Sequence, residues 1–162
     1  MKFSPQSKVW IYQSDRKMSD QEVEEISLML HDFTQRWKAH GYQLQAKAEV
    51  LYNYFIVLFA EEQGMAQVSG CSISSSMDEI DKIGQKFNID FFNRYNMAYK
   101  IDDEVQLAKK EDFETLITTK QIGLDTIVFN NLVLSLDEFE HKWEVALKDS
   151  WHKQIFAEQL NA

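Results

Sequence analysis

Cysteine, proline and glycine are all scarce in this sequence. Its 162 residues include one cysteine, one proline and five glycines. A single cysteine excludes an internal disulfide, a CxxC redox pair and a zinc site built from several thiolates, and it suits a reducing compartment. Hydrophobic residues nevertheless make up 44% of the chain, which argues for a folded core and against disorder.

Basic residues and long apolar runs are also lacking. Asp and Glu outnumber Lys and Arg by 26 to 17, which gives a net charge of −9. A nucleic acid would be repelled by this charge, so we expect no nucleic-acid partner. The longest apolar run, residues 55–60, has six residues, whereas a membrane span needs roughly 20. The first residues show no signal-peptide core, and we expect a cytoplasmic protein without a membrane partner.

The clearest predicted element is a helix over residues 20–40. Ser19 and Glu22 form a capping-box pattern at its start, and Gly41 follows as a stop signal. Apolar residues recur at spacings of 3, 4, 3 and 4 at Val23, Ile26, Leu30, Phe33 and Trp37. This periodicity predicts one buried helix face.

The remaining patterns predict an α+β fold. Alternating or continuous apolar residues predict strands at 8–13, 44–52, 55–60 and 95–101, and a second helix is predicted at 77–88, capped by Ser76 and Glu79. A tight turn is expected at Asn53-Tyr54. The resulting β-α-β-β-α-β order is the split arrangement of ferredoxin-like folds.

The rest of the chain predicts a small C-terminal α/β extension. It contains, in order, a strand at 104–108 after an Asp102-Asp103 turn, a helix at about 110–119, a strand at 126–129, and helices that begin after Ser135 and Asp149. We therefore expect a core domain of residues 1–101 with an extension of residues 102–162 packed on it, or a single domain overall.

Several motifs carry a family resemblance. They include Val-Trp-Ile-Tyr-Gln-Ser-Asp-Arg at 9–16, Gly-Cys-Ser-Ile at 70–73 and Thr-Ile-Val-Phe-Asn-Asn-Leu-Val at 126–133, with further matches at 55–59, 143–145 and 150–152. The chain resembles a family of short bacterial proteins often labelled "ABC transporter ATPase". Residues 104–143 are also similar to the bacterial form of the GYF peptide-binding module, which implies protein binding, although the aromatic dipeptide that names the module is missing.

The transporter label fails a chemical test. A phosphate-binding loop needs G-x-x-x-x-G-K-[ST], in which the lysine reaches the outer phosphates. The nearest stretch runs from Gly64 to Gly70, is one residue too long, and has Cys71 where the lysine must be. Without that cation, little would offset the charge of a triphosphate. We expect no ATPase activity.

The serine-rich stretch at residues 69–76 has two interpretations. In the first, it is a structural turn whose serines cap the following helix, and its cysteine is a small buried hydrophobe. In the second, its hydroxyls and free amides bind a small anion, and the thiol is a candidate nucleophile because a helix dipole favours a thiolate. The first is favoured. The candidate ligand-binding residues here are Ser69, Gly70, Cys71, Ser72 and Ser74.

Two polar pairs follow predicted strands, where ligands commonly bind. They are Asp15 with Arg16, and Asn130 with Asn131; both also fit ordinary turns. The four histidines show no metal-ligand spacing, and the acidic pair Glu61-Glu62 is expected to be solvated. We expect no metal and no cofactor.

Tryptophans supply the candidate partner surface. Trp37 belongs to the apolar stripe of its helix and is predicted to be core. Trp143 and Trp151, with the adjacent His152, lie on short C-terminal elements, where an aromatic side chain can form a binding surface. The leading hypothesis is a non-catalytic protein- or peptide-interaction module. The alternative is a protein that binds a small anion or metabolite at residues 69–76, either as a binding protein or as an enzyme that uses Cys71. The sequence gives no oligomeric state.

Overall fold

The structure is a computed structural model that describes residues 2–162. It divides into two compact units. The first comprises residues 2–93 together with Leu134–Asp137, and the second comprises Arg94–Val133 and Glu138–Ala162. Helices and antiparallel sheets occur in both units, which confirms the predicted α+β class.

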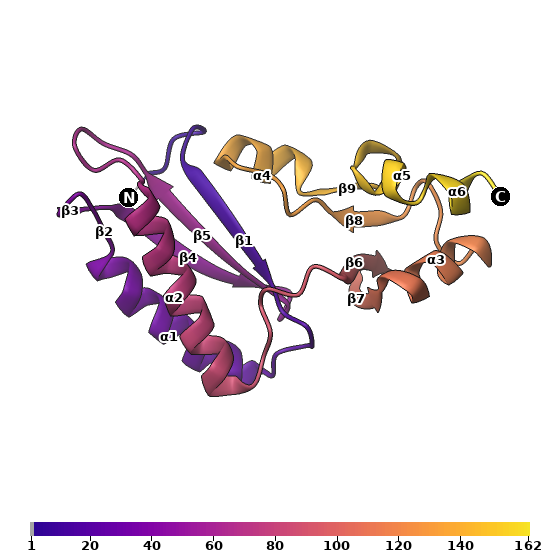
Figure 1. Cartoon of the computed structure of the whole chain (residues 1–162), viewed down its shortest axis with the longest axis horizontal. Coiled ribbons are helices and arrows are strands. Elements are labelled where there is room, and N and C mark those ends of the chain that lie inside the picture. Colours follow the sequence, from indigo (N-terminus) through magenta and orange to yellow (C-terminus); the bar gives the residue numbers. More distant parts are fainter. Residues whose placement is uncertain (1) are drawn as a thin grey trace. The chain divides into compact units, whose positions relative to one another are not determined.

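The first unit contains the predicted split β-α-β arrangement. Its sheet has the order β1-β5-β4, formed by β1 (Lys8–Gln13), β5 (Phe55–Glu61) and β4 (Gln45–Leu51). Because β5 is antiparallel to both neighbours, β1 and β4 run in the same direction on either side of it. Helices α1 (Asp20–Arg36) and α2 (Gly70–Phe87) cover one face of this sheet (Figure 1).

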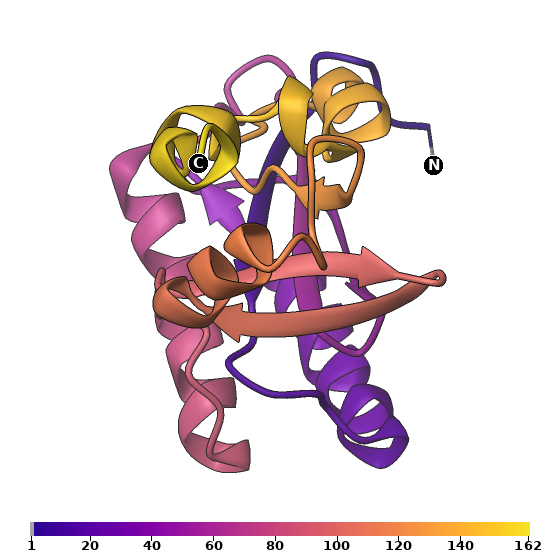
Figure 2. The same ribbon diagram turned by 90° about the vertical axis from the view of Figure 1, so that its right-hand side faces the viewer.

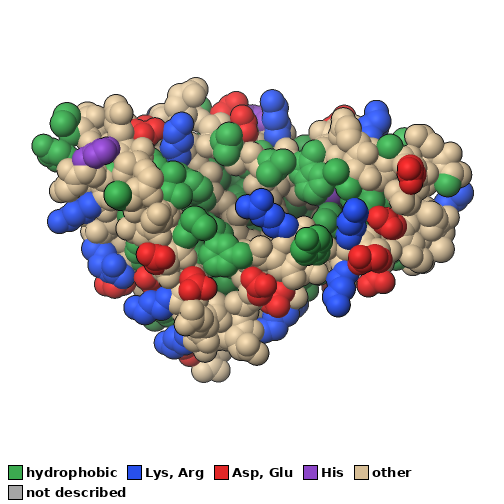
Figure 3. All heavy atoms as spheres, viewed as in Figure 1, with side chains coloured by type: hydrophobic (Ala, Val, Ile, Leu, Met, Phe, Trp, Pro, Cys, Tyr) green, Lys and Arg blue, Asp and Glu red, His purple; other side chains and the backbone are tan. Residues whose placement is uncertain are grey.

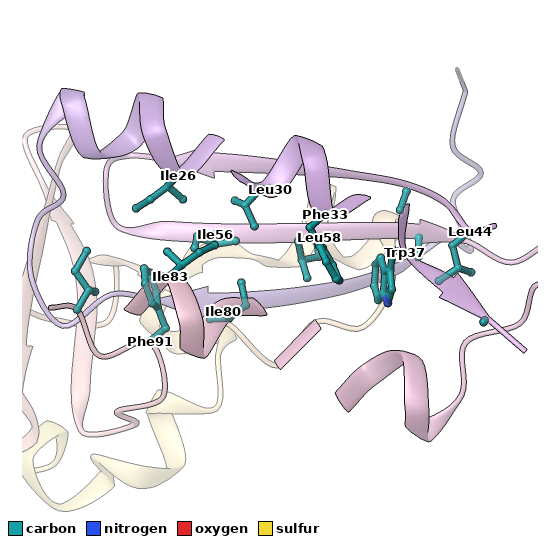
Figure 4. Packing of buried hydrophobic residues seen from close by; sticks show 14 of the residues in the cluster. Ile26, Leu30, Phe33, Trp37, Leu44, Ile56, Leu58, Ile80, Ile83 and Phe91 are labelled. Carbon is teal, nitrogen blue, oxygen red and sulfur yellow. The ribbon is translucent and has the colours of Figure 1, made fainter. Parts of the chain in front are cut away.

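The core of this unit lies between the two helices and the sheet (Figure 4). Side chains from α1, β5 and α2 meet there, and each is at most 3% exposed: Ile26, Leu30, Phe33, Ile56, Leu58, Ile80 and Ile83. Burial of each such side chain contributes about 1.5–3 kcal/mol. All residues from 55 to 60 are buried, as the continuous apolar run predicted.

Helix α1 ends earlier than predicted. Trp37 is its C-cap in extended conformation, and the chain then forms a small hairpin of β2 (Lys38–Ala39) and β3 (Tyr42–Gln43). His40 and Gly41 turn this hairpin with φ values of 52° and 79°. The glycine therefore serves a hairpin turn rather than a helix stop, because only left-handed backbone closes so short a loop.

The fourth strand of a ferredoxin-like sheet is missing from the first unit. The strand predicted at 95–101 exists as β6 (Asn96–Ile101), but it belongs to the sheet of the second unit. Its expected place beside β1 is taken by Leu134–Leu136, where Val9 N–H donates to Leu134 O and Leu136 N–H donates to Ser7 O. Only a single bridge, between Lys8 and Ser135, results.

Glu61 fixes the N-terminal segment to the end of β5. Its carboxylate accepts hydrogen bonds from the backbone N–H and the hydroxyl of Ser4 and from the hydroxyl of Ser7. The Ser7 hydroxyl and the Ser4 donors lower the pKa of Glu61. The expectation that Glu61 is simply solvated is therefore wrong.

The second unit is a four-stranded antiparallel sheet with helices. The sheet order is β7-β6-β8-β9, with β7 (Glu104–Lys109), β8 (Ile127–Phe129) and β9 (Glu144–Ala146). β6 and β7 form a long hairpin (Figure 2). As predicted, Asp102 and Asp103 make its turn, with φ values of 50° and 65°.

Short helices complete this unit. They are α3 (Lys110–Thr118), α4 (Leu136–Lys142), the 3-10 helix η1 (Leu147–Asp149), α5 (His152–Ile155) and α6 (Ala157–Leu160). Leu136 and Asp137, which begin α4, belong to the first unit. Phe113 of α3 packs on Phe156 with ring centroids 4.8 Å apart. In place of the single helix expected after Asp149, the chain forms two short helices, α5 and α6, with Phe156 between them.

Candidate functional site

The serine-rich stretch is the start of a helix rather than a turn. α2 begins at Gly70, seven residues before the predicted start at 77. Ser69 is its N-cap: the Ser69 hydroxyl accepts from the Ser72 N–H at 3.4 Å, and the Ser72 hydroxyl accepts from the Ser69 N–H at 2.7 Å. This reciprocal pair caps the helix, so Ser76 and Glu79, the predicted capping pair, lie inside it.

Cys71 lies on the first turn of α2 and is exposed. The preferred interpretation of this residue as a small buried hydrophobe is therefore wrong. Gly70 and Ser74 are exposed as well, whereas Ser69 is half-buried and Ser72 is buried. The five candidate residues thus divide between an outer side and an inner side of one helix end.

The outer side presents backbone donors together with the thiol. The first N–H groups of a helix have no acceptor within the helix. The Ser72 amide is bonded to Ser69, which leaves the amides of Gly70 and Cys71 for an outside acceptor. A small anion would fit such donors chemically, since the N-terminus of a helix carries partial positive charge.

The inner side of the same helix end is structural. The Trp37 indole N–H donates to the carbonyl oxygen of Ser72 at 2.9 Å. Ser76 is fully buried, and its hydroxyl donates to the carbonyl oxygen of Ile73 at 2.7 Å. Burial raises the pKa of Tyr12, against the opposing effect of its hydrogen bond with Ser76. Strand β1 and helices α1 and α2 therefore share buried polar contacts that sequence reasoning missed.

Asp15 and Arg16 are occupied by structural contacts. Asp15 accepts from the backbone N–H of Asp90 at 3.0 Å. Arg16 makes a bidentate pair with Glu22, at 2.9 and 2.7 Å, and also donates to the carbonyl oxygen of Phe87. The two residues connect the start of α1 to the end of α2. Their role as ligand-binding residues stays a prediction.

Asn130 and Asn131 likewise support their own loop. The Asn131 side-chain oxygen accepts from the Trp143 indole N–H at 2.9 Å. The Asn130 side-chain oxygen accepts from the Leu132 N–H, and the Asn130 backbone N–H donates to the carbonyl oxygen of Trp143. Trp143 is 3% exposed and stacks on Phe139. The prediction that Trp143 belongs to a partner surface is wrong, because its ring and its N–H are both used inside the fold.

His152 is also part of the core. It is 1% exposed, and its Nδ1 lies 2.7 Å from the hydroxyl oxygen of Ser150, which is buried too. Desolvation by burial lowers the pKa of His152 to about 4. A neutral imidazole closed off in this way cannot contact a partner, so its assignment to the binding surface is wrong.

Trp151 is the one predicted partner residue that keeps an exposed portion. Its ring is half-buried and stacks on His152, with centroids 3.8 Å apart and planes 20° apart. Its indole nitrogen is buried, and it is the only such side-chain atom in residues 2–162 without a hydrogen-bond partner. An unsatisfied buried donor costs about 1–3 kcal/mol.

Exposed apolar side chains occur on the segments next to Trp151. Ile155, one helical turn later, is 54% exposed, and its N–H donates to the carbonyl oxygen of Trp151. Leu124 is 46% exposed, and its carbonyl oxygen accepts from the Lys148 N–H. Trp151 and Ile155 lie one helical turn apart, and we call these two residues the C-terminal apolar surface.

Acidic and basic side chains are interspersed on the face shown in Figure 3. Among the described residues, no group of three or more His, Cys, Asp or Glu side chains is arranged to hold a metal ion. Within the same residues, no helix combines the length and the apolar character that crossing a membrane requires.

Comparison of the chain with protein-family models, with curated proteins and with solved structures gives no match. The geometry of the residues is therefore what a functional proposal for this protein must rest on.

Proposed function

We propose that this chain is a non-catalytic protein- or peptide-interaction module that binds its partner through the C-terminal apolar surface. The observation that carries the proposal is the state of Trp151. Part of the ring is exposed, exposed Ile155 follows it by one turn, and the buried indole N–H lacks an acceptor. Tryptophan is enriched among the residues that dominate binding energy at interfaces.

The neighbouring residues support Trp151 in this role. His152 stacks on one face of the indole ring and is fixed by Ser150. A held ring loses little conformational entropy when a partner binds. The buried indole N–H has no acceptor inside the fold, and the exposed part of Trp151 offers an apolar contact to a partner. An extended peptide offers apolar side chains that can pack on this exposed part.

A capture experiment tests the proposal. The tagged chain and two variants, Ile155→Asp and Leu28→Asp, are used to isolate partners from the cells that express the protein. Leu28 is a matched control because it is 68% exposed on α1, outside the C-terminal apolar surface. We expect a stoichiometric partner with the unchanged chain and with Leu28→Asp, and its loss with Ile155→Asp. Failure to recover any stoichiometric partner would count against the proposal, as would equal recovery with both variants.

A second candidate function rests on the exposure of Cys71. With the Gly70 and Cys71 amides, this thiol forms a donor-bearing surface at the start of an 18-residue helix, suited to a small anion or metabolite. Gly70 provides a sharp test, because proline is tolerated at the first helical position and removes only the N–H. Alanine there keeps the amide, and its Cβ would meet nothing within 4 Å.

Thermal-shift measurements with phosphate, nucleotides and carboxylates at millimolar concentration distinguish the two variants. If the second function is correct, one of these ligands raises the melting temperature of the unchanged chain and of Gly70→Ala, and the rise is lost in Gly70→Pro. No shift with any ligand removes this candidate.

A further inference from the structure

The outer edge of β4 is an open sheet edge. β4 is the last strand in the order β1-β5-β4, and its seven residues are all paired with β5 on one side. In the part of the chain that the structure describes, no strand pairs with its other side. An uncovered edge exposes a row of backbone N–H and C=O groups that can pair with another strand.

The two faces of β4 differ in chemistry. Ala46, Ala48 and Val50 face the helices and contribute to the core. Lys47 and Glu49 alternate with them and so lie on the other face, 43% and 42% exposed, with Lys47 Nζ 3.4 Å from a carboxylate oxygen of Glu49. The strand therefore carries one cation and one anion, on either side of Ala48.

This arrangement is complementary to itself. Two copies of one strand can pair antiparallel about a two-fold axis normal to the sheet. Residues that lie opposite each other then point to the same face of the sheet, so the axis passes between the two copies of one residue. Centred on Ala48, the pairing places Lys47 opposite Glu49 of the partner subunit, and places Glu49 opposite Lys47 of the partner subunit. Opposite charges that face each other across two strands stabilise the pairing.

Neighbouring registers lack this match. Centring on Lys47 opposes two lysines, and centring on Glu49 opposes two glutamates; like charges directly opposite are destabilising. A shift by one residue therefore converts two attractive pairs into a repulsive one. The charge pattern selects a single register.

The other outer strands are less suitable. β1 is already bridged by Ser135 at Lys8. β9 has only three residues. In β7, centring on Gln106 or on Leu107 places no lysine opposite a glutamate within the strand. Compared with β1, β7 and β9, β4 is the strand that combines length, an unpaired side and charge complementarity.

We infer that β4 is the contact strand of a homodimer, in which two copies pair antiparallel around Ala48 and the two β1-β5-β4 sheets continue into one another. The partner of this edge is a second copy of the chain. The inference is independent of the function proposed for the C-terminal apolar surface.

Charge reversal distinguishes loss of the dimer interface from loss of folding stability, because a second reversal can restore the interface. Sedimentation equilibrium of the full chain should show a species of twice 19.1 kDa. Lys47→Glu places Glu opposite Glu and Glu49→Lys places Lys opposite Lys, so each variant alone should dimerise at least about tenfold more weakly. Mixing the two variants restores opposite charges at both positions, and the double variant K47E/E49K does the same. Both samples should recover the dimer.

A matched control and a second design complete the test. Lys82→Glu reverses an exposed charge on α2, away from the edge, and should leave the dimer unchanged.

A cross-linking experiment serves if either reversal prevents folding. In a Cys71→Ser background, oxidation of Ala48→Cys should link two copies at the two-fold axis. Lys82→Cys in the same background should remain unlinked. A monomeric unchanged chain at about 100 μM would overturn the inference, as would a mixture that stays monomeric or an Ala48→Cys chain that does not cross-link.

Discussion

The indole N–H of Trp37 donates a hydrogen bond to the backbone carbonyl oxygen of Ser72 at 2.9 Å, and both residues are buried. The bond joins the residue that ends α1 to the first turn of α2. The outer side of that turn carries exposed Cys71. The position of this candidate anion site therefore depends on a tryptophan in the core.

Replacement of Trp37 by phenylalanine should destabilise the first unit by about 2 kcal/mol. The change removes a buried hydrogen bond and part of a ring that is 2% exposed. Urea unfolding provides the measurement. Trp10→Phe is the control, because Trp10 is only partly buried and packs edge-on against Trp37. If both variants lose the same stability, the hydrogen bond to Ser72 does not contribute.

Protonation of His152 should destabilise the second unit. Its pKa in the fold is about 4, against an ordinary value of 6.5. The unfolded chain binds the proton first as the pH falls, so the contribution of neutral His152 to stability is complete above pH 6.5 and declines between 6.5 and 4, by about 3 kcal/mol in total. NMR titration of the imidazole should give a midpoint near 4. A midpoint near 6.5 would contradict the buried neutral state, and His152→Gln should abolish the decline over this range.

The Arg16–Glu22 pair should add stability that is lost only in strong acid. Hydrogen bonds from Arg16 and from the Ser19 backbone lower the pKa of Glu22 to about 2, from an ordinary 4.5. The contribution is present above pH 4.5 and disappears as the pH falls towards 2. Because the pair is partly exposed, we expect roughly 1 kcal/mol.

Unfolding of Glu22→Gln at pH 2.5 and pH 5.5 measures this contribution. The variant should lose stability at pH 5.5 and little at pH 2.5. Glu24→Gln, at an exposed neighbouring position, should change neither value. Equal losses at both pH values would show that the charge of Glu22 is not what stabilises the fold.

Asp103→Gly should stabilise the β6–β7 hairpin. Asp103 has a φ of 65°, a conformation that glycine adopts without steric cost, and Asp-Gly is a preferred pair in such turns. We expect a gain of about 0.5 kcal/mol in unfolding free energy. Asp103→Ala, which keeps a Cβ in the same conformation, should lose stability instead. A loss with glycine would mean that the Asp103 side chain contributes more than the backbone strain costs.

The sequence predicted elements well where a periodic pattern and its end signals agree. Ser19 and Glu22 do form a capping box, and the alternation in β4 and the continuous apolar run in β5 correspond to an edge strand and a central strand. The start of α2 was missed because two capping patterns compete there. Ser76 with Glu79 matches the usual pattern, but Ser69 with Ser72 forms the cap.

Pairing between distant segments was harder to predict. β6 has the alternation expected of a strand, and local sequence does not indicate that it pairs with β7 and β8 instead of β1. The same limit applies to the candidate site. Trp143 and Trp151 look alike in sequence, yet Asn131 satisfies the indole of Trp143 while no described residue satisfies that of Trp151.

The central claim is that the C-terminal apolar surface binds a protein partner, and site-specific photo-cross-linking tests it most directly. A photoreactive side chain is placed at Ile155 or, as the control, at Leu28, which is also exposed, and the protein is irradiated in the cells that express it. The proposal predicts one discrete cross-linked partner from position 155 and none of the same mass from position 28. No cross-link at 155, or the same products from both positions, would contradict it.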